Sequence, residues 1–400
     1  MSSTSGEQTV TAEGWARRAG VAGAALGVVA AGVAVERLTV QRSVRRKAKL
    51  ALDATGPYGT LRGTAGTAIA DDGTELHYEV DEPTEQPPRR HRFRRTDPAP
   101  TLVFSHGYCL TQDSWHFQRE ALRELGTVRA VYWDQRSHGR SERGRAQAAG
   151  ARGAVPVSIE RLGRDLRAVL DAAVPDGPVV LVGHSMGGMT MMALAAQFPD
   201  WVAERVVGAA FVATSAGGLG EVTYGLPASG MRALRRVVPG VLHTLAAYST
   251  LVERGRAATA DLLAGLVKHY SFGEPRTVDP AVARFAERMI EATPIDVVAE
   301  FYPAFHGHEK TEALTAFTAC ASLVMAGDKD QLTPHAHSEA IASLLPDALL
   351  EIVPDTGHLL MLERPELLNG RLLDLMERAC TPPPGRRIPR AARGARTTRR

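Results

Sequence analysis

The sequence has few of the features that mark specialised classes of protein. Its 400 residues contain only three cysteines, Cys109, Cys320 and Cys380, at unrelated spacings. They supply neither a disulfide framework nor a metal-binding pattern, and they leave the redox compartment open. The formal net charge is only +3, so we expect no overall attraction to nucleic acid. No internal repeat is apparent, so nothing indicates a repeat architecture.

Long apolar runs are also scarce, since only residues 19–35 form an uninterrupted one. As a helix this run would reach about 26 Å, slightly short of the roughly 30 Å of a bilayer core. A membrane helix is the favoured interpretation, and a cleaved export signal or a packed helix of a soluble protein are the alternatives. Positive charge is heavier in residues 36–50 than in residues 1–18. A spanning helix would therefore leave the domain that follows it in the cytoplasm.

The basic residues are concentrated in two further segments. Arginines crowd residues 89–95, and seven more lie between Arg386 and Arg400. We interpret residues 82–100 as a loop and residues 381–400 as a tail, both solvated. Contact with an anionic membrane surface is the alternative.

The remaining chain alternates between strand-like and helix-like segments. With 44% apolar residues, it is long enough for one large domain with extensions. Alternation of this kind predicts a mainly parallel sheet with helices on both faces. Between residues 217 and 312 only helical patterns occur, which predicts a helical cap inserted between two strands of the sheet. The expected strands are 67–70, 75–80, 101–105, 128–133, 178–182, 206–212, 321–325 and 349–353; the expected helices are 111–125, 159–173, 189–198, 229–238, 257–270, 280–292, 294–305, 334–345 and 365–380.

We therefore divide the chain into an N-terminal segment and basic linker (1–60), a core formed by 61–216 and 313–380, a cap (217–312) and a basic tail (381–400). Ligands of such sheets bind at the carboxyl ends of the strands. Candidate residues are therefore sought in the loops that follow the strands.

The most informative of these loops reads Gly183-His184-Ser185-Met186-Gly187. It lies between a strand-like and a helix-like segment, which is the context of a nucleophile elbow. Such a turn is so tight that glycine is needed on both sides of the serine. The N–H groups at the start of the next helix favour a developing negative charge. Ser185 is therefore the candidate nucleophile, and His184 is assigned to packing.

A serine hydroxyl needs a base, and the base needs a carboxylate to orient it. His358 follows the strand 349–353 and is the candidate base. Asp330 and Asp328 both follow the strand 321–325, and Asp355 lies in the same loop as His358. We favour Asp330 as the acid, because Asp328 is near enough to the strand to brace the turn.

The negative oxygen of a tetrahedral intermediate needs N–H donors. One predicted donor is the backbone N–H of Met186, which follows the nucleophile. The other is the backbone N–H of Tyr108, in the loop His106-Gly107-Tyr108-Cys109 that follows the strand 101–105.

Together these motifs resemble the α/β-hydrolase fold superfamily, of the capped type with a His-Gly loop. The resemblance covers about residues 101–377 and includes 134–141, Asp-Gln-Arg-Ser-His-Gly-Arg-Ser, which looks like the family's D-x-R-G-x-G-x-S loop. Ser137 replaces the usual glycine, which should hardly affect the chemistry because that loop is structural. Membership implies an eight-stranded, mostly parallel sheet with a cap inserted after the sixth strand. It also implies the triad Ser185, Asp330 and His358, and no cofactor or metal.

These expectations add up to a serine hydrolase that acts on a small-molecule acyl substrate. Activity should decline at acid pH, where a protonated imidazole cannot act as a base. An esterase or lipase is favoured, and a thioesterase, a C–C bond hydrolase and a cofactor-free haloperoxidase use the same constellation. A non-catalytic ligand-binding member of the fold is the alternative of another class. The serine at position 185 argues against epoxide hydrolases and haloalkane dehalogenases, which resemble this fold but place aspartate there.

Overall fold

The computed structural model describes residues 58–84, 99–145, 157–222, 240 and 269–380. The predicted apolar segment 19–35, most of the arginine-rich loop and the tail 381–400 lie outside these ranges, so the proposed anchor and the localisation remain predictions. Within the described ranges, no helix combines the length and the hydropathy that crossing a membrane requires.

The described strands form one eight-stranded sheet in the order β1-β2-β4-β3-β5-β6-β7-β8. Strands β1 and β2 form an antiparallel hairpin, and β2 also pairs antiparallel with β4. The remaining neighbours in the sheet pair in parallel. The predicted mostly parallel sheet is confirmed. Its strands are β1 (Thr64–Ile69), β2 (Glu75–Asp81), β3 (Thr101–Ser105), β4 (Ala130–Trp133), β5 (Val179–His184), β6 (Val206–Val212), β7 (Ala321–Gly327) and β8 (Ala348–Val353).

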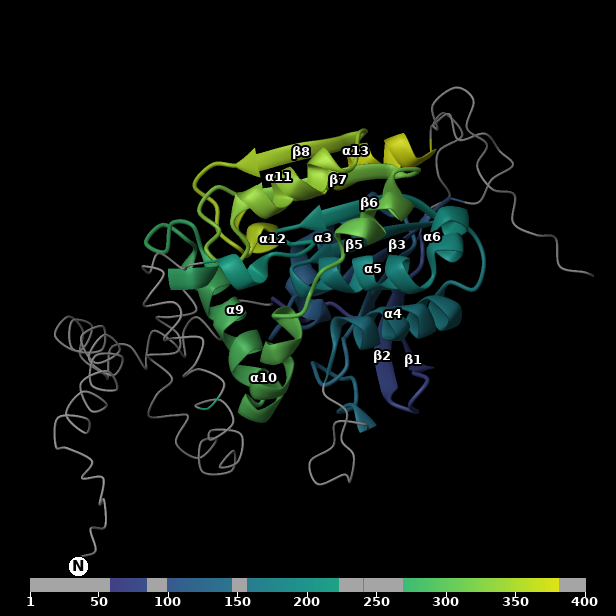
Figure 1. Ribbon diagram of the computed structural model, residues 1–400, viewed down its shortest axis with the longest axis horizontal. Coiled ribbons are helices and arrows are strands. Elements are labelled where there is room, and N and C mark those ends of the chain that lie inside the picture. The colour runs from purple at the N-terminus through teal and green to yellow at the C-terminus, as the bar shows by residue number, and fades with distance from the viewer. Residues whose placement is uncertain (1–57, 85–98, 146–156, 223–239, 241–268, 381–400) are drawn as a thin grey trace, which may run out of the picture. The chain divides into compact units, whose positions relative to one another are not determined.

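Helices cover both faces of this sheet (Figure 1). Side chains of β5 alternate between the two layers: Val179 and Leu181 pack with one set of helices, and Val180 and Val182 with the other. The first set is α4 (Ile159–Ala173), α5 (Met186–Gln197), α6 (Pro199–Arg205) and α11 (His335–Ser343). The second set is α3 (His116–Leu125), α12 (Leu360–Glu363) and α13 (Pro365–Cys380). Since both faces are buried, β3, β4 and β5 consist of buried residues throughout.

The chain between β6 and β7 contains the helices α9 (Pro280–Ala292) and α10 (Ile295–Phe301) and the short 3-10 turns η3 (Leu219–Glu221), η4 (Tyr302–Phe305) and η5 (Thr311–Phe317). The α9 helix has the predicted bounds, and α10 with η4 covers the predicted helix 294–305. The predicted helix 229–238 and nearly all of the predicted helix 257–270 lie outside the described residues. The bounds 217–312 of the cap therefore remain a prediction.

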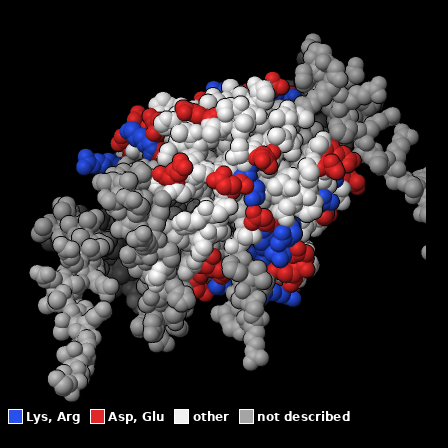
Figure 2. All heavy atoms as spheres, viewed as in Figure 1, with Lys and Arg blue, Asp and Glu red and all other residues white. Residues whose placement is uncertain are grey.

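Charged side chains of both signs are interspersed on the face shown in Figure 2, with no large patch of one sign among the described residues there. Many of the surface charges are paired. Arg161 and Arg164 of α4 both contact Asp71, and Arg167 contacts Asp171 one turn along the helix. Pairs of this kind contribute little to stability, about 0–1 kcal/mol each.

Candidate active site

The predicted nucleophile lies in a strained turn at the carboxyl end of β5. Ser185 has φ 51° and ψ −118°, a conformation that non-glycine residues seldom adopt. A Cβ atom at Gly187 would lie 2.1 Å from the carbonyl oxygen of Ser105, and one at Gly183 would lie 2.6 Å from the Gly188 nitrogen. Glycine is therefore required on both sides, as the motif predicts. The surrounding contacts hold the strain in place, and Ser185 remains partly exposed.

The end of β6 and the residues that follow it fix the backbone of this serine. The Ser185 N–H donates to the carbonyl oxygen of Val212 at the end of β6, at 3.0 Å. The Thr214 hydroxyl donates to the Ser185 carbonyl oxygen at 2.7 Å. The turn is thus held by the adjacent strand as well as by its own glycines.

The predicted base and acid meet at the carboxyl ends of β7 and β8. His358 Nδ1 lies 2.8 Å from Asp330 Oδ2, and both side chains are buried. Because an ionised carboxylate can only accept, Nδ1 carries the proton and Nε2 has a free lone pair. The other oxygen, Asp330 Oδ1, accepts the N–H groups of Leu332 at 2.8 Å and Thr333 at 2.9 Å, and the Thr333 hydroxyl donates to Oδ2 at 2.9 Å.

The two alternative acids are placed differently. Asp328 is exposed and accepts the N–H of Thr356 at 3.3 Å, so it does brace the turn. Asp355 is exposed and forms an ion pair with Lys329 at 2.7 Å. Of the three candidate carboxylates, the structure puts Asp330 against the imidazole.

His184 links the elbow to the loop of the base. Its Nε2 lies 2.9 Å from the carbonyl oxygen of His358, and the two rings are 4.7 Å apart. Burial and the neighbouring His358 hold the pKa of His184 well below its usual range, so the imidazole is neutral and donates from Nε2. The sequence predicts a packing role for His184, and the structure adds a hydrogen bond that joins the two loops.

The Ser185 hydroxyl makes no hydrogen bond to any residue that the structure describes, including His358. A contact of this kind is often long before substrate binds and shortens in the complex. The candidate nucleophile, base and acid thus lie at one edge of the sheet, with the base–acid contact formed.

The predicted donors of the oxyanion hole also lie at this edge. A Cβ atom at Gly107 would be 3.3 Å from Ser185 Cβ, so the loop 106–112 passes directly beside the elbow. Neither the Tyr108 N–H nor the Met186 N–H has a hydrogen-bond partner in the described part of the chain. The Tyr108 side chain is fixed elsewhere: its hydroxyl donates to the Val298 carbonyl oxygen of α10 at 2.5 Å.

An apolar cluster borders the elbow on the side of α10. Its buried members include Met186, Met189, Val297 and Phe301, and Tyr108 and Phe305 pack against it. The described residues contain no group of three or more His, Cys, Asp or Glu side chains arranged to hold a metal ion.

A search of family models matches residues 100–365 to the alpha/beta hydrolase fold. The chain belongs to this family. As an α/β hydrolase, the protein is an enzyme, and several of the proteins that it resembles are named as hydrolases.

A protein of Variovorax paradoxus, provisionally named as the carbamate hydrolase RutD, is 28% identical over 310 residues, which cover 77% of this chain and 98% of that protein. A monoacylglycerol lipase of Mycolicibacterium smegmatis is 25% identical over 270 residues, which cover 66% and 82% of the two chains. Among solved structures, an esterase from Thermogutta terrifontis has a TM-score of 0.57 at 23% identity, covering 79% of this chain and 99% of its own. A bromoperoxidase from Bacillus anthracis has the same TM-score at 17% identity, covering 78% and 99%. These two structures show the fold alone.

The α/β hydrolase site includes residues that the sequence motifs did not identify. Thr333 contacts Asp330, and its position three residues after an aspartate is typical of a turn closed by that side chain. Glu363 accepts the N–H groups of Gly357 at 2.7 Å and Gly273 at 3.0 Å, and so holds the loop of the base against the segment before α9. No local pattern indicates the Glu363 contacts, because Gly273 is 90 residues away in the chain.

Proposed function

We propose that this α/β hydrolase cleaves a carboxylic ester, or a related acyl bond, through an acyl-enzyme intermediate on Ser185. His358 acts as the general base and acid, and Asp330 orients it. The observation that carries the proposal is the 2.8 Å contact between His358 Nδ1 and buried Asp330, at the edge where the strained Ser185 projects.

In the first half of the reaction, His358 Nε2 takes the proton of the Ser185 hydroxyl as its oxygen attacks the carbonyl carbon. The Asp330 carboxylate stabilises the imidazolium that forms. The imidazolium then protonates the leaving group, and the acyl group remains on Ser185. In the second half, His358 takes a proton from water, which attacks the acyl-enzyme and releases the acid.

The negative oxygen of each tetrahedral intermediate would be stabilised by the N–H groups of Met186 and Tyr108. Loss of one such donor costs about 10²–10³ in kcat in other enzymes. The absence of any other partner for these two groups among the described residues supports this role, as does the start of α5 at Met186, because a helix N-terminus favours negative charge.

The apolar cluster beside Met186 supports an apolar acyl or alkyl group in the substrate. The names of the two relatives, a carbamate hydrolase and a monoacylglycerol lipase, both refer to cleavage at a carbonyl carbon. A thioesterase, a C–C bond hydrolase and a cofactor-free haloperoxidase would use the same residues. These activities remain alternatives within the proposed mechanism.

The test combines activity with covalent labelling. Ser185→Ala should lower kcat for p-nitrophenyl esters by about 10⁶-fold while the thermal midpoint is retained. A fluorophosphonate probe should label the wild-type protein at Ser185 and leave the variant unlabelled. Full ester hydrolysis by the variant, or labelling at another serine, would refute the proposal. A folded wild-type protein that neither hydrolyses nor binds the probe would indicate the non-catalytic alternative.

A further inference from the structure

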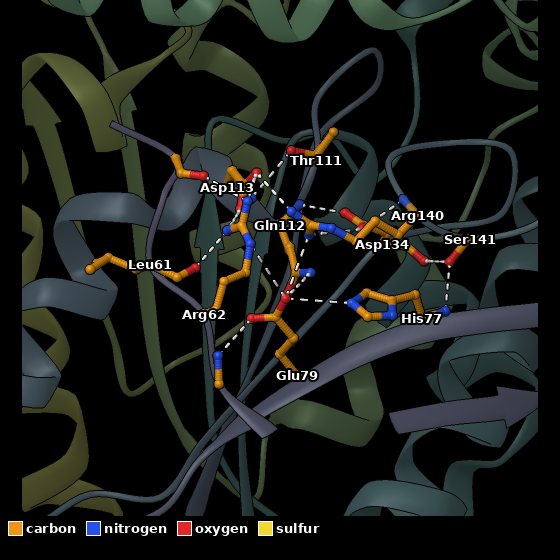
Figure 3. A network of polar contacts seen from close by, with 12 residues as sticks. Leu61, Arg62, His77, Glu79, Thr111, Gln112, Asp113, Asp134, Arg140 and Ser141 are labelled. Carbon is orange, nitrogen blue, oxygen red and sulfur yellow. Dashed lines mark hydrogen bonds and ion pairs between the residues drawn. The ribbon is translucent and has the colours of Figure 1, made fainter. Parts of the chain in front are cut away.

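The loop 134–141, which the sequence presents as structural, holds the loop 106–112 at three points. The Asp134 carboxylate accepts the Gln112 N–H at 2.7 Å (Figure 3). His106 Nε2 accepts the Gln135 N–H at 2.9 Å, and the Gln135 amide donates to the His106 carbonyl oxygen at 2.5 Å. His138 Nε2 accepts the Cys109 N–H at 3.2 Å. The third contact is the one beside Tyr108.

The contact between His138 and Cys109 requires a neutral imidazole. Nδ1 lies 2.9 Å from the Arg136 carbonyl oxygen and donates to it, which leaves the Nε2 lone pair for the Cys109 N–H. His138 is only 2% exposed, and burial lowers the pKa of its side chain to about 4. The ring is therefore uncharged at neutral pH, in the tautomer that both contacts need.

Cys109 needs such a restraint because of its backbone conformation. It has φ 58°, a value that a side chain disfavours and that surrounding contacts must maintain. Its N–H belongs to the peptide that follows Tyr108. Only the φ and ψ rotations of Tyr108 separate this peptide from the one that carries the Tyr108 N–H, so holding it restricts the direction in which that N–H can point.

The loop 134–141 is itself rigidly anchored. Arg136 is fully buried and contacts Asp165 of α4 at 2.5 Å and Asp72 of the β1–β2 turn at 2.9 Å. At its other end, the Ser141 hydroxyl accepts the His77 N–H of β2 at 2.8 Å and donates to the Asp134 carbonyl oxygen, as Figure 3 shows. His138 thus connects the loop 106–112 to the frame of the fold.

We infer that His138 is a positioning residue of the reaction: its Nε2 fixes the Cys109 peptide so that the Tyr108 N–H points at the oxygen that becomes negative. The inference rests on the proposed function, because it assigns His138 to the predicted oxyanion hole. It departs from the purely structural role that the sequence motif implies for this loop.

Two amide variants separate the contacts of the ring. His138→Gln carries its amide near the position of Nε2, so its oxygen can still accept the Cys109 N–H. His138→Asn carries its amide near Nδ1, so it can contact Arg136 but cannot reach Cys109. His116→Gln is the matched control, since His116 is a buried histidine whose Nδ1 accepts the Gly59 N–H at 3.4 Å, outside both loops.

For p-nitrophenyl esters, His138→Asn should lower kcat by about 10²-fold with KM within about twofold of wild type, because a misplaced donor affects the transition state most. Its affinity for a boronic acid, which forms a tetrahedral adduct with the serine, should fall by a similar factor. The kcat of His138→Gln should exceed that of His138→Asn by at least about tenfold. His116→Gln should stay within about threefold of wild type.

Equal kcat in His138→Asn and wild type would overturn the inference, and so would equal losses in the Asn and Gln variants that follow their thermal midpoints. Failure of the proposed function looks different, because the wild-type protein itself would then resist the fluorophosphonate probe. A wild-type protein that is labelled and active, with an unaffected Asn variant, would overturn only the role of His138.

Discussion

The two sides of the candidate site are held by different chemical groups. On the oxyanion side, the neutral imidazoles of His106 and His138 bind backbone groups of the loop 106–112 and its neighbour. On the acid–base side, the carboxylates of Asp330 and Glu363 accept the N–H groups of the loops around His358. On both sides, a buried side chain holds the backbone of a loop in place.

The difference follows from the charge that each side meets during catalysis. A carboxylate beside the oxyanion hole would repel the developing negative oxygen, whereas one beside His358 stabilises the imidazolium. Asp134 is a carboxylate on the oxyanion side, but it contacts the loop at Gln112, four residues beyond Tyr108. Burial raises its pKa to about 6. The comparison predicts that activity depends most on negative charge on the acid–base side. On the oxyanion side, it should depend on the position and the neutrality of the side chains that hold the loop.

The largest effect should come from removing the charge that faces His358. Asp330→Asn keeps an oxygen for the backbone N–H groups but presents an amide to Nδ1, which favours the wrong tautomer. It should lower kcat by about 10³–10⁴-fold. Asp328→Asn is the matched control in the same turn and should stay within about threefold, because Asp328 is exposed and its contact among the described residues is with the Thr356 backbone N–H. Steady-state ester hydrolysis by both variants measures the difference. A loss of activity in the Asp328 variant alone would indicate that Asp328, and not Asp330, orients His358.

The sequence predicts the parts of this comparison that depend on local pattern. The spacing of apolar residues in 159–173 gives α4 with its observed bounds, because an amphipathic face and the Ser158 cap coincide there. By contrast, the predicted helix 189–198 starts three residues later than α5, which begins directly at Met186. Since nearly all of α5 is buried, its residues show no alternation between an apolar and a polar face that could mark where the helix begins.

The contacts between loops are beyond such patterns. His138 and Cys109 are 29 residues apart, and His184 and His358 are 174 apart. In both pairs an imidazole meets a backbone group, so no complementary side chain in the sequence marks the partner. The candidate triad could be proposed because each member follows a strand; the residues that position it could not.

A smaller effect should come from moving the start of the oxyanion loop. Gly187→Ala would press a methyl group against the Ser105 carbonyl oxygen, just before the loop 106–112. Because backbone must shift, we expect a loss of about 3 kcal/mol in the free energy of unfolding, together with a lower kcat. Gly370→Ala in α13 is the matched control: nothing lies within 4 Å of its added Cβ, so it should stabilise by about 0.5–1 kcal/mol. Denaturant unfolding measures both, and an unchanged stability in Gly187→Ala would show that the two loops can separate freely.

The smallest predicted effect tests the neutrality of the oxyanion side. Burial lowers the pKa of His106 to about 3 and that of His138 to about 4, both below the usual value of 6.5. As the pH falls from 6.5 to 5, the unfolded chain therefore takes up protons that these folded imidazoles do not, and stability falls. His138→Gln removes one such group, so it should lose about 1.5 kcal/mol less than wild type over this interval. His335→Gln, at a histidine whose side chain is 44% exposed, controls for the loss of an imidazole. Parallel stability curves for wild type and His138→Gln would mean that His138 becomes protonated in the folded protein over the same pH range as in the unfolded chain. The pKa of His138 would then not be lowered, which would contradict its burial as a neutral ring.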